Sequence, residues 1–107
     1  RAVRAAATRV EHAEMADAAA VAALASLGLS ASVQPLFDAR WGGPDGMYAR
    51  RLGGERAARL NPFADLAAAG VPLALGSDSL VTPVDPWATV GAALHHRTPG
   101  QRITARA

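Results

Sequence analysis

The chain has 107 residues, a formal net charge of +2 and no cysteine, and 50% of its residues are hydrophobic. This length allows one domain with a modest core, and the lack of cysteine excludes disulfide scaffolds, cysteine-based zinc sites and thiol catalysis. No apolar run approaches the roughly 20 residues that a transmembrane helix needs, so we expect no membrane partner.

The basic residues do not favour a nucleic-acid partner. All 11 of them are arginine, nine carboxylates are interspersed among them, and only 5% of the residues are aromatic. So few aromatic side chains provide no platform on which bases could stack. An alanine-rich chain without lysine is more typical of coding bias than of selection for phosphate contacts.

Short strands and helices are predicted to alternate along the chain. The stretch before Gly28 is rich in alanine and leucine, with Asp17 near its start as a cap and the glycine as its stop. Alternation of this kind indicates a parallel sheet covered by helices. We therefore expect an α/β protein with strands over residues 8–13, 29–34 and 71–76 and helices over residues 15–27, 61–70 and 85–96.

Two further features define the predicted helices and the loop between them. Asn61 and Asp85 each precede a proline, which predicts an N-cap followed by the first helical residue. Trp87, Val90 and Leu94 then share one face of the last helix. Residues 36–54 contain five glycines and a proline, and we expect a long loop there with one helical turn around residues 46–52.

The two ends of the chain give weaker patterns. Arginines at helical spacing predict that residues 1–7 are the tail of a helix. Residues 97–107 are polar, with a turn expected at residues 98–100 and another helix expected to begin at Ile103.

His12 and Asp78 are the strongest candidates for chemistry. His12 is placed at the carboxyl end of the first strand and Asp78 just beyond the end of the third, the edge at which parallel α/β folds build active sites. Imidazole and carboxylate are both zinc ligands, so the pair predicts part of a metal site. The alternative is a hydrogen-bonded core histidine and an aspartate that caps a turn, and two ligands are fewer than a catalytic site needs.

Other polar residues have simpler explanations. Glu11 points to the face opposite His12, and we expect a buried ion pair with Arg4 or Arg9. Adjacent helix positions diverge by about 100°, so His95 and His96 are expected at a surface helix end, where the helix dipole favours cationic histidine. Gln34, Arg40 and Trp41 are candidate substrate contacts, and packing explains the loop residues Arg40, Trp41 and Tyr48 equally well.

The sequence resembles the metal-dependent amidohydrolase superfamily, and more closely its amidohydrolase family 3 branch, which includes YtcJ-like proteins and N-substituted formamide deformylases. The resemblance covers essentially the whole chain, and its most specific part is EHA followed by SVQP and then by GSDS. The matching stretches are RVEHAEM at 9–15, ASVQP at 31–35, WGGPDGMYARRLG at 41–53, AGVPLALGSDSLVTPVDPW at 69–87 and HHRTPGQRITARA at 95–107.

The resemblance implies a (β/α)₈ TIM barrel that hydrolyses amide or formamide-like carbon–nitrogen bonds, other than peptide bonds, in small molecules. One or two divalent metal ions, commonly zinc, activate the attacking water. His12 matches the histidine ligand of the sixth strand. Asp78 matches the aspartate of the eighth strand, which binds metal and takes a proton from the attacking water.

Parts of the family pattern are missing from this sequence. It has no HxH pair, no lysine that could be carboxylated and no histidine that fits the fifth strand. A complete barrel needs roughly 250 residues, so residues 1–107 are expected to be a C-terminal fragment that holds strands six to eight. We expect the isolated fragment to be inactive and the whole enzyme to be cytoplasmic, with a homo-oligomer as an open possibility. The competing hypothesis is a non-catalytic α/β binding module or degenerate half-barrel.

Overall fold

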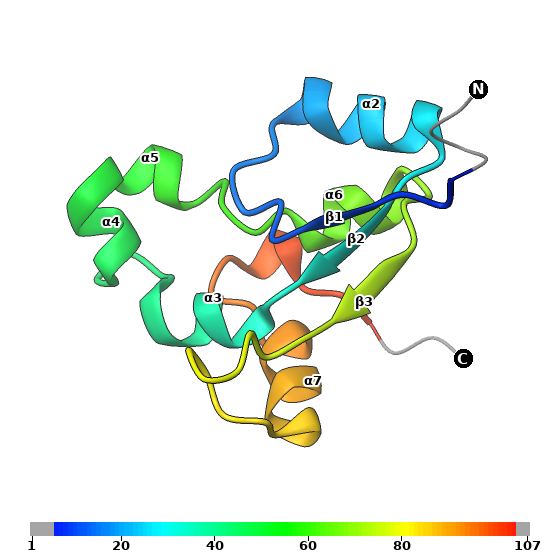
Figure 1. The fold of residues 1–107 in the computed structure, drawn as a ribbon. Helices are drawn as coiled ribbons and strands as arrows, with labels where there is room; N and C mark the ends of the chain where they lie inside the picture. Colours follow the sequence, from blue (N-terminus) through cyan, green and yellow to red (C-terminus); the bar gives the residue numbers. More distant parts are fainter. Residues whose placement is uncertain (1–5, 105–107) are drawn as a thin grey trace.

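Three short parallel strands form the centre of the fold in the computed structural model, which describes residues 6–104 (Figure 1). β2 (Ser30–Val33) lies between β1 (Arg9–Glu11) and β3 (Leu73–Leu75). Because both pairings are parallel, the carboxyl ends of all three strands lie at the same edge of the sheet. The predicted α/β class with a parallel sheet is confirmed.

β2 is the best-covered strand and fixes the alignment of its neighbours. Ser32 lies opposite Glu11 of β1 and opposite Ala74 of β3. Ala31 and Val33, on the other face of β2, are completely buried. Burial of this face specifies the register, since a slip by one residue would turn both apolar side chains toward the polar side.

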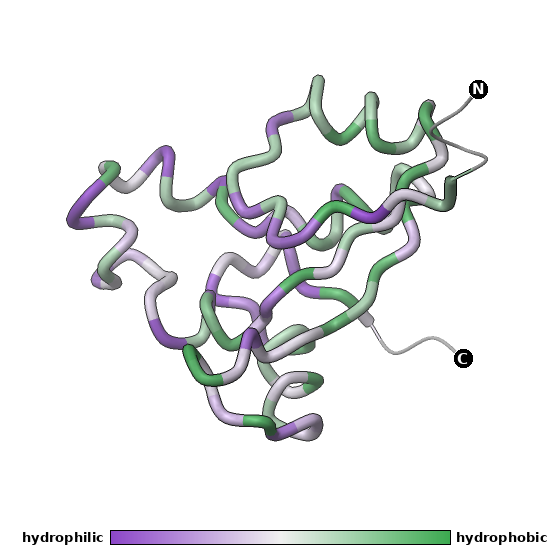
Figure 2. Tube along the Cα trace, in the orientation of Figure 1, coloured by the Kyte–Doolittle hydropathy of each residue, from purple (hydrophilic) through white to green (hydrophobic). Residues whose placement is uncertain are grey.

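The first helix, α2 (Ala18–Leu27), begins and ends where the sequence predicts. The Asp17 carboxylate accepts a hydrogen bond from the Ala20 amide at 2.9 Å, and Gly28 closes the helix in the left-handed region at a φ of 68°. Figure 2 shows α2 as an almost continuously hydrophobic segment. Among residues 6–104, no helix has both the length and the hydropathy of a membrane span.

The segment after β2 is mostly helical, so the long loop predicted for residues 36–54 is wrong in its first part. Pro35 occupies the first turn of a helix, where its fixed φ favours helix formation. Gly42, Gly46 and Gly53 stand at helix ends instead of forming one extended loop. The four helices between β2 and β3 are α3 (Pro35–Trp41), α4 (Met47–Leu52), α5 (Gly54–Ala57) and α6 (Phe63–Ala68).

Asn61 does not cap α6, which corrects the second helix start. It adopts a φ of 53° two residues before the helix begins, and no side chain caps α6. Its backbone instead joins two distant segments, since its amide donates to the Glu14 carbonyl oxygen at 2.8 Å and its carbonyl oxygen lies 2.9 Å from Nε2 of His96. Tertiary hydrogen bonds therefore set the conformation of Asn61.

The last helix, α7 (Pro86–Leu94), starts as predicted but buries a different face. The Asp85 carboxylate accepts from the amide three residues later at 2.9 Å. Thr89 and Ala93 are the buried side chains of α7, whereas Trp87 is 84% exposed.

The apolar face predicted for α7 is therefore the outer one: Val90 is exposed and Leu94 is only half-buried. Small side chains on the inner face let α7 approach α3 closely, and these two helices pack together. The close packing of α7 against α3 therefore determines which face of α7 is buried, although the larger apolar side chains lie on the other face.

The main core lies where α2 and α6 meet the sheet. Phe63 and Leu66 of α6 are completely buried there, and Val21 of α2 packs with them. Burying side chains of this size contributes roughly 1.5–3 kcal/mol each. The buried cluster consists of Val21, Ala31, Val33, Phe63, Leu66 and Val71.

Only part of each segment predicted for the two ends of the chain lies within the described residues. Residues 6–7 form a turn, and the rest of the helix predicted for residues 1–7 lies outside the described residues. The turn expected at residues 98–100 is the short 3₁₀ helix η1 (Pro99–Gln101). Residues 103–104 are not helical, and the remainder of the helix predicted from Ile103 also lies outside the described residues.

His96 is completely buried, so its expected position as a surface cation is wrong. Its Nδ1 accepts a hydrogen bond from the Thr98 amide at 2.9 Å, and its Nε2 lies 2.9 Å from the Asn61 carbonyl oxygen. A backbone amide only donates and a carbonyl only accepts, so His96 is the neutral tautomer with its proton on Nε2. Burial lowers the pKa of His96, and this effect exceeds the opposing one of nearby Asp38.

This burial makes the stability of the fold dependent on pH. Above pH 6.5, the ordinary pKa of histidine, His96 is neutral in both the folded and the unfolded chain. Below that pH the unfolded chain binds a proton that the folded chain excludes, so the free energy of unfolding decreases until the lowered folded pKa is reached. Urea unfolding at several pH values measures this decrease.

We expect His96→Gln to remove that part of the pH dependence and His95→Gln, at an exposed position, to retain it. Equal slopes below pH 6.5 in the two variants would contradict the burial of a neutral His96. Asp38 and Arg102 also face the ring, and both are unchanged in this comparison.

Candidate functional site

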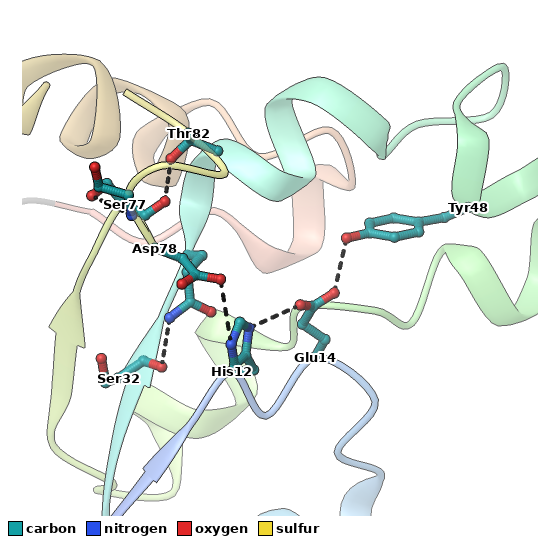
Figure 3. Close-up of polar contacts among 9 residues, drawn as sticks. His12, Glu14, Ser32, Tyr48, Ser77, Asp78 and Thr82 are labelled. Atoms are coloured by element: carbon teal, nitrogen blue, oxygen red, sulfur yellow. Dashed lines mark hydrogen bonds and ion pairs between the residues drawn. The ribbon is translucent and has the colours of Figure 1, made fainter. Parts of the chain in front are cut away.

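His12 and Asp78 come together at the carboxyl edge of the sheet, as the sequence predicts (Figure 3). His12 follows β1 directly, Asp78 lies three residues beyond β3, and His12 Nε2 is 3.6 Å from Asp78 Oδ2. The two side chains are 43% and 40% exposed, so solvent and small molecules reach both. The His12 amide donates to the Ser32 carbonyl oxygen at 2.8 Å, which fixes the start of this turn to β2.

The backbone turns sharply at both residues. His12 has a φ of 68°, Ala13 a φ of 53° and Asp78 a φ of 50°. Non-glycine residues in the left-handed region are uncommon and are concentrated at functional sites. The first turn follows β1 directly and the second lies three residues beyond β3, at the edge where the two polar side chains meet.

Glu14 is a third polar side chain in this cluster, and the sequence patterns did not predict its place there. Its Oε1 lies 3.3 Å from His12 Nδ1, and its Oε2 accepts a hydrogen bond from the Tyr48 hydroxyl at 2.8 Å. Figure 3 shows His12 between the carboxylates of Asp78 and Glu14. The available indication was the second glutamate of EHAEM, which places a carboxylate two residues after the candidate ligand His12.

A row of aromatic rings forms a second connection between His12 and Tyr48. The Phe37 ring centroid lies 5.7 Å from that of His12 and 4.9 Å from that of Trp41, and Trp41 lies 6.3 Å from Tyr48. The Phe37–Trp41 and Trp41–Tyr48 pairs meet edge to face, an arrangement that aromatic rings prefer. Trp41, a candidate substrate contact, is thus packed between two other rings.

Gln34 and Arg40 lie beside the two candidate ligands. Gln34 is buried, and its Nε2 donates at 3.2 Å to the Ser32 carbonyl oxygen that also accepts from the His12 amide. Its Oε1 is buried without a hydrogen-bond partner among the described residues. Arg40 Nη1 donates at 3.3 Å to the carbonyl oxygen of Val81, which lies in the loop after Asp78.

Internal hydrogen bonds support the loop that carries Asp78. The Thr82 hydroxyl, which is completely buried, donates to the Ser77 carbonyl oxygen. The Val81 amide donates to the Asp78 carbonyl oxygen at 2.7 Å, and the Ser79 amide donates to Ser77 Oγ at 3.2 Å. Figure 3 shows Ser77 and Thr82 above Asp78 in this view, joined by their hydrogen bond.

Glu11 lies outside the cluster, as expected from its place on the strand. Arg9 Nε is 2.5 Å from Glu11 Oε1, which confirms Arg9 as the partner, but both side chains are largely exposed and the expected burial is wrong. A hydrogen bond with Ser32 is the largest cause that lowers the pKa of Glu11, and Arg9 adds to it. The other proposed partner, Arg4, lies outside the described residues.

The donor atoms of His12 and Asp78 fit part of a divalent-metal site. Imidazole nitrogen and carboxylate oxygen are typical zinc ligands, and catalytic zinc uses three protein ligands and keeps one position open. Within residues 6–104, no group of three or more histidine, cysteine, aspartate or glutamate residues could hold a metal ion. Among residues 6–104, His12 and Asp78 are therefore a pair of suitable donors and do not form a complete set of metal ligands.

Comparison with known proteins identifies a family to which the sequence is similar. The model of the amidohydrolase family matches residues 1–106 of the chain. A search of curated proteins found no significant match. Among solved structures, an uncharacterized metal-dependent hydrolase from Pyrococcus furiosus is similar, with 28% identity, a TM-score of 0.78 and coverage of 92% of this chain.

A second similar structure is an uncharacterized metal-dependent hydrolase from Pyrococcus horikoshii OT3. It shares 33% identity with the chain, has a TM-score of 0.68 and covers 80% of it. The aligned regions make up only 20% of the first hydrolase and 17% of the second. The chain therefore spans about a fifth of the length of these structures.

Tyr48 provides a direct test of the contact with Glu14, because it is the single tyrosine of the chain. Partial burial raises the pKa of Tyr48 well above its ordinary value of 10.0, and the Glu14 carboxylate raises it further. In a spectrophotometric titration of the phenolate, we expect no tyrosine ionisation at pH 10 in the folded chain.

Glu14→Gln is expected to lower the pKa of Tyr48 toward 10.0, because the negative charge beside the hydroxyl is removed. Glu11→Gln is the matched control, since it removes one charge at an exposed position on the other side of His12. An unchanged titration in Glu14→Gln would show that the two side chains do not interact in solution.

Proposed function

The chain belongs to the amidohydrolase family, and from this membership we propose that it forms part of a metal-dependent hydrolase. The proposed reaction is hydrolysis of an amide or formamide-like carbon–nitrogen bond, other than a peptide bond, in a small molecule. The observation that carries the proposal is the convergence of His12 and Asp78, with Nε2 and Oδ2 3.6 Å apart at the carboxyl edge of the sheet.

His12 and Asp78 are the residues proposed to hold the metal, with zinc as the preferred ion and one or two ions in the complete site. The chemistry that such an ion supplies when bound is a lower pKa for a water molecule and polarisation of the carbonyl that is attacked. His12 would bind through Nε2, the ring nitrogen that faces Asp78.

Asp78 has a second proposed role as general base. A carboxylate accepts protons, and the 40% exposure of this side chain leaves it accessible to water and substrate. Asp78 takes the proton from the attacking water and returns it to the nitrogen that leaves, so one side chain serves both proton transfers. The braced turn at residues 77–82 holds the carboxylate in one place during both steps.

Two further residues are proposed to contact the substrate. The unpaired Oε1 of Gln34 is a buried acceptor beside the His12 backbone, and a substrate N–H would satisfy it. Arg40 would act from the rim, where it touches the loop after Asp78. The packing of Trp41 between Phe37 and Tyr48 favours a supporting role for its ring.

The proposed context is a (β/α)₈ barrel in which β1, β2 and β3 are strands six, seven and eight. A barrel needs roughly 250 residues, and the aligned regions make up only 20% and 17% of the similar hydrolases. β1 and β3 are both partly exposed, as strands are where a further strand could pair. The chain alone is proposed to be inactive, because it contributes two ligands of a larger set.

Metal analysis and hydrolysis assays on the complete protein that carries these residues test the proposal. We expect stoichiometric divalent metal and hydrolysis of N-formyl or related amides. His12→Ala should lower the metal content, and Asp78→Asn should reduce kcat by about 10²- to 10⁴-fold, the usual contribution of a general base.

Two exposed substitutions serve as controls, His95→Ala and Asp45→Asn, which should retain both metal and activity. A complete protein without bound metal, or one that keeps full activity after Asp78→Asn, would overturn the proposal and leave the non-catalytic binding module as the better hypothesis.

A further inference from the structure

His12 has a carboxylate on each side of its ring. Glu14 Oε1 is 3.3 Å from Nδ1, and Asp78 Oδ2 is 3.6 Å from Nε2. A carboxylate offers only acceptors, and a neutral imidazole has a single N–H. The two carboxylates therefore compete for one proton, and the ring nitrogen that loses this competition presents a lone pair.

Distance favours Glu14 in this competition. Its contact with Nδ1 is a hydrogen bond, whereas the separation between Nε2 and Asp78 exceeds the usual hydrogen-bond limit. Glu14 is also the less exposed carboxylate, at 22% against 40% for Asp78. A less solvated carboxylate competes less with water and holds a donor more strongly.

Glu14 is itself held from two sides. The Tyr48 hydroxyl donates to Oε2 at 2.8 Å, which leaves Oε1 to face His12. The Glu14 carbonyl oxygen accepts from the Asn61 amide at 2.8 Å, so its backbone is fixed to the segment before α6. The raised pKa of Tyr48 keeps the hydroxyl protonated and able to donate.

The aromatic row and the Glu14 carboxylate together form a closed loop of contacts that begins and ends at the His12 ring. From His12 it passes through Phe37 and Trp41 to Tyr48, and it returns through the Glu14 carboxylate. One side of this loop of contacts fixes the ring by packing and the other fixes its proton by hydrogen bonding. None of these contacts involves Asp78, so they hold the His12 ring in place without a bound ligand.

We propose that Glu14 is a positioning residue, which holds the His12 proton on Nδ1 and so directs the lone pair of Nε2 toward Asp78. Tyr48 acts through Glu14 by orienting its carboxylate. The consequence for metal binding rests on the function proposed above, because a neutral histidine binds metal through an unprotonated nitrogen. A carboxylate on the other nitrogen makes that ligand more basic and fixes its orientation.

Nitrogen-15 NMR of histidine-labelled full chain tests the proton position without any metal. At a pH where the rings are neutral, the Nδ1 and Nε2 shifts show which nitrogen carries the proton. His96 is an internal reference of opposite tautomer, since its contacts require the proton on Nε2. We expect His12 to carry its proton on Nδ1.

In Glu14→Ala we expect the His12 proton to move to Nε2, where Asp78 accepts it. Glu14→Gln keeps the size of the side chain and removes its charge, and we expect it to raise the fraction of His12 that carries its proton on Nε2. This variant tests the proposal even if Glu14→Ala disturbs the fold and shifts the His96 signals. Glu11→Gln, a charge-matched control, should leave the tautomer unchanged. An Nε2–H His12 in the wild type, or no change in Glu14→Gln, would overturn the proposal.

Zinc titration of the complete protein provides the second measurement. Removing such a carboxylate partner usually weakens metal binding by about 10- to 100-fold, and we expect this loss in Glu14→Gln but not in Glu11→Gln. Equal zinc affinity in the two variants would contradict a positioning role. If the wild type binds no zinc, the proposed function fails, and the tautomer measurement still decides whether Glu14 holds the His12 proton.

Discussion

The candidate site depends on the parallel pairing of β2 with β1 on one side and β3 on the other. The register of Glu11, Ser32 and Ala74 aligns the three strands, and burial of Ala31 and Val33 makes a slip costly. Parallel pairing brings the carboxyl ends of β1 and β3 to one edge, although more than sixty positions separate His12 from Asp78 in the sequence. The His12–Asp78 pair is thus a consequence of strand pairing, and the local turns only adjust it.

Those turns determine which atoms face each other. Left-handed backbone at His12 and Ala13 bends the chain after β1, so that Glu14 meets one ring nitrogen while Asp78 meets the other. Helices α3 and α4 supply the aromatic packing and the Tyr48 hydroxyl. A segment rich in glycine therefore contributes a rigid support, because its glycines end helices and let the chain turn between them.

Local patterns predicted the features that depend on local chemistry. The Asp17 and Asp85 caps, the parallel strands and the convergence of His12 and Asp78 each follow from neighbouring residues or from strand alternation. Features that depend on tertiary contacts were missed. His95 and His96 look equivalent in sequence, and only the packing of His96 against Asn61 and Thr98 buries it. Glu14 was missed because its role requires Tyr48, which lies 34 positions away.

We propose that His12 Nε2 and Asp78 share a metal ion at the carboxyl edge of the sheet. A crystal structure of the complete protein grown with zinc, with anomalous data collected at the zinc edge, tests it most directly. We expect a zinc peak about 2.0–2.2 Å from both His12 Nε2 and an Asp78 carboxylate oxygen, with the Glu14 carboxylate still beside Nδ1. A zinc peak that neither residue contacts would contradict it.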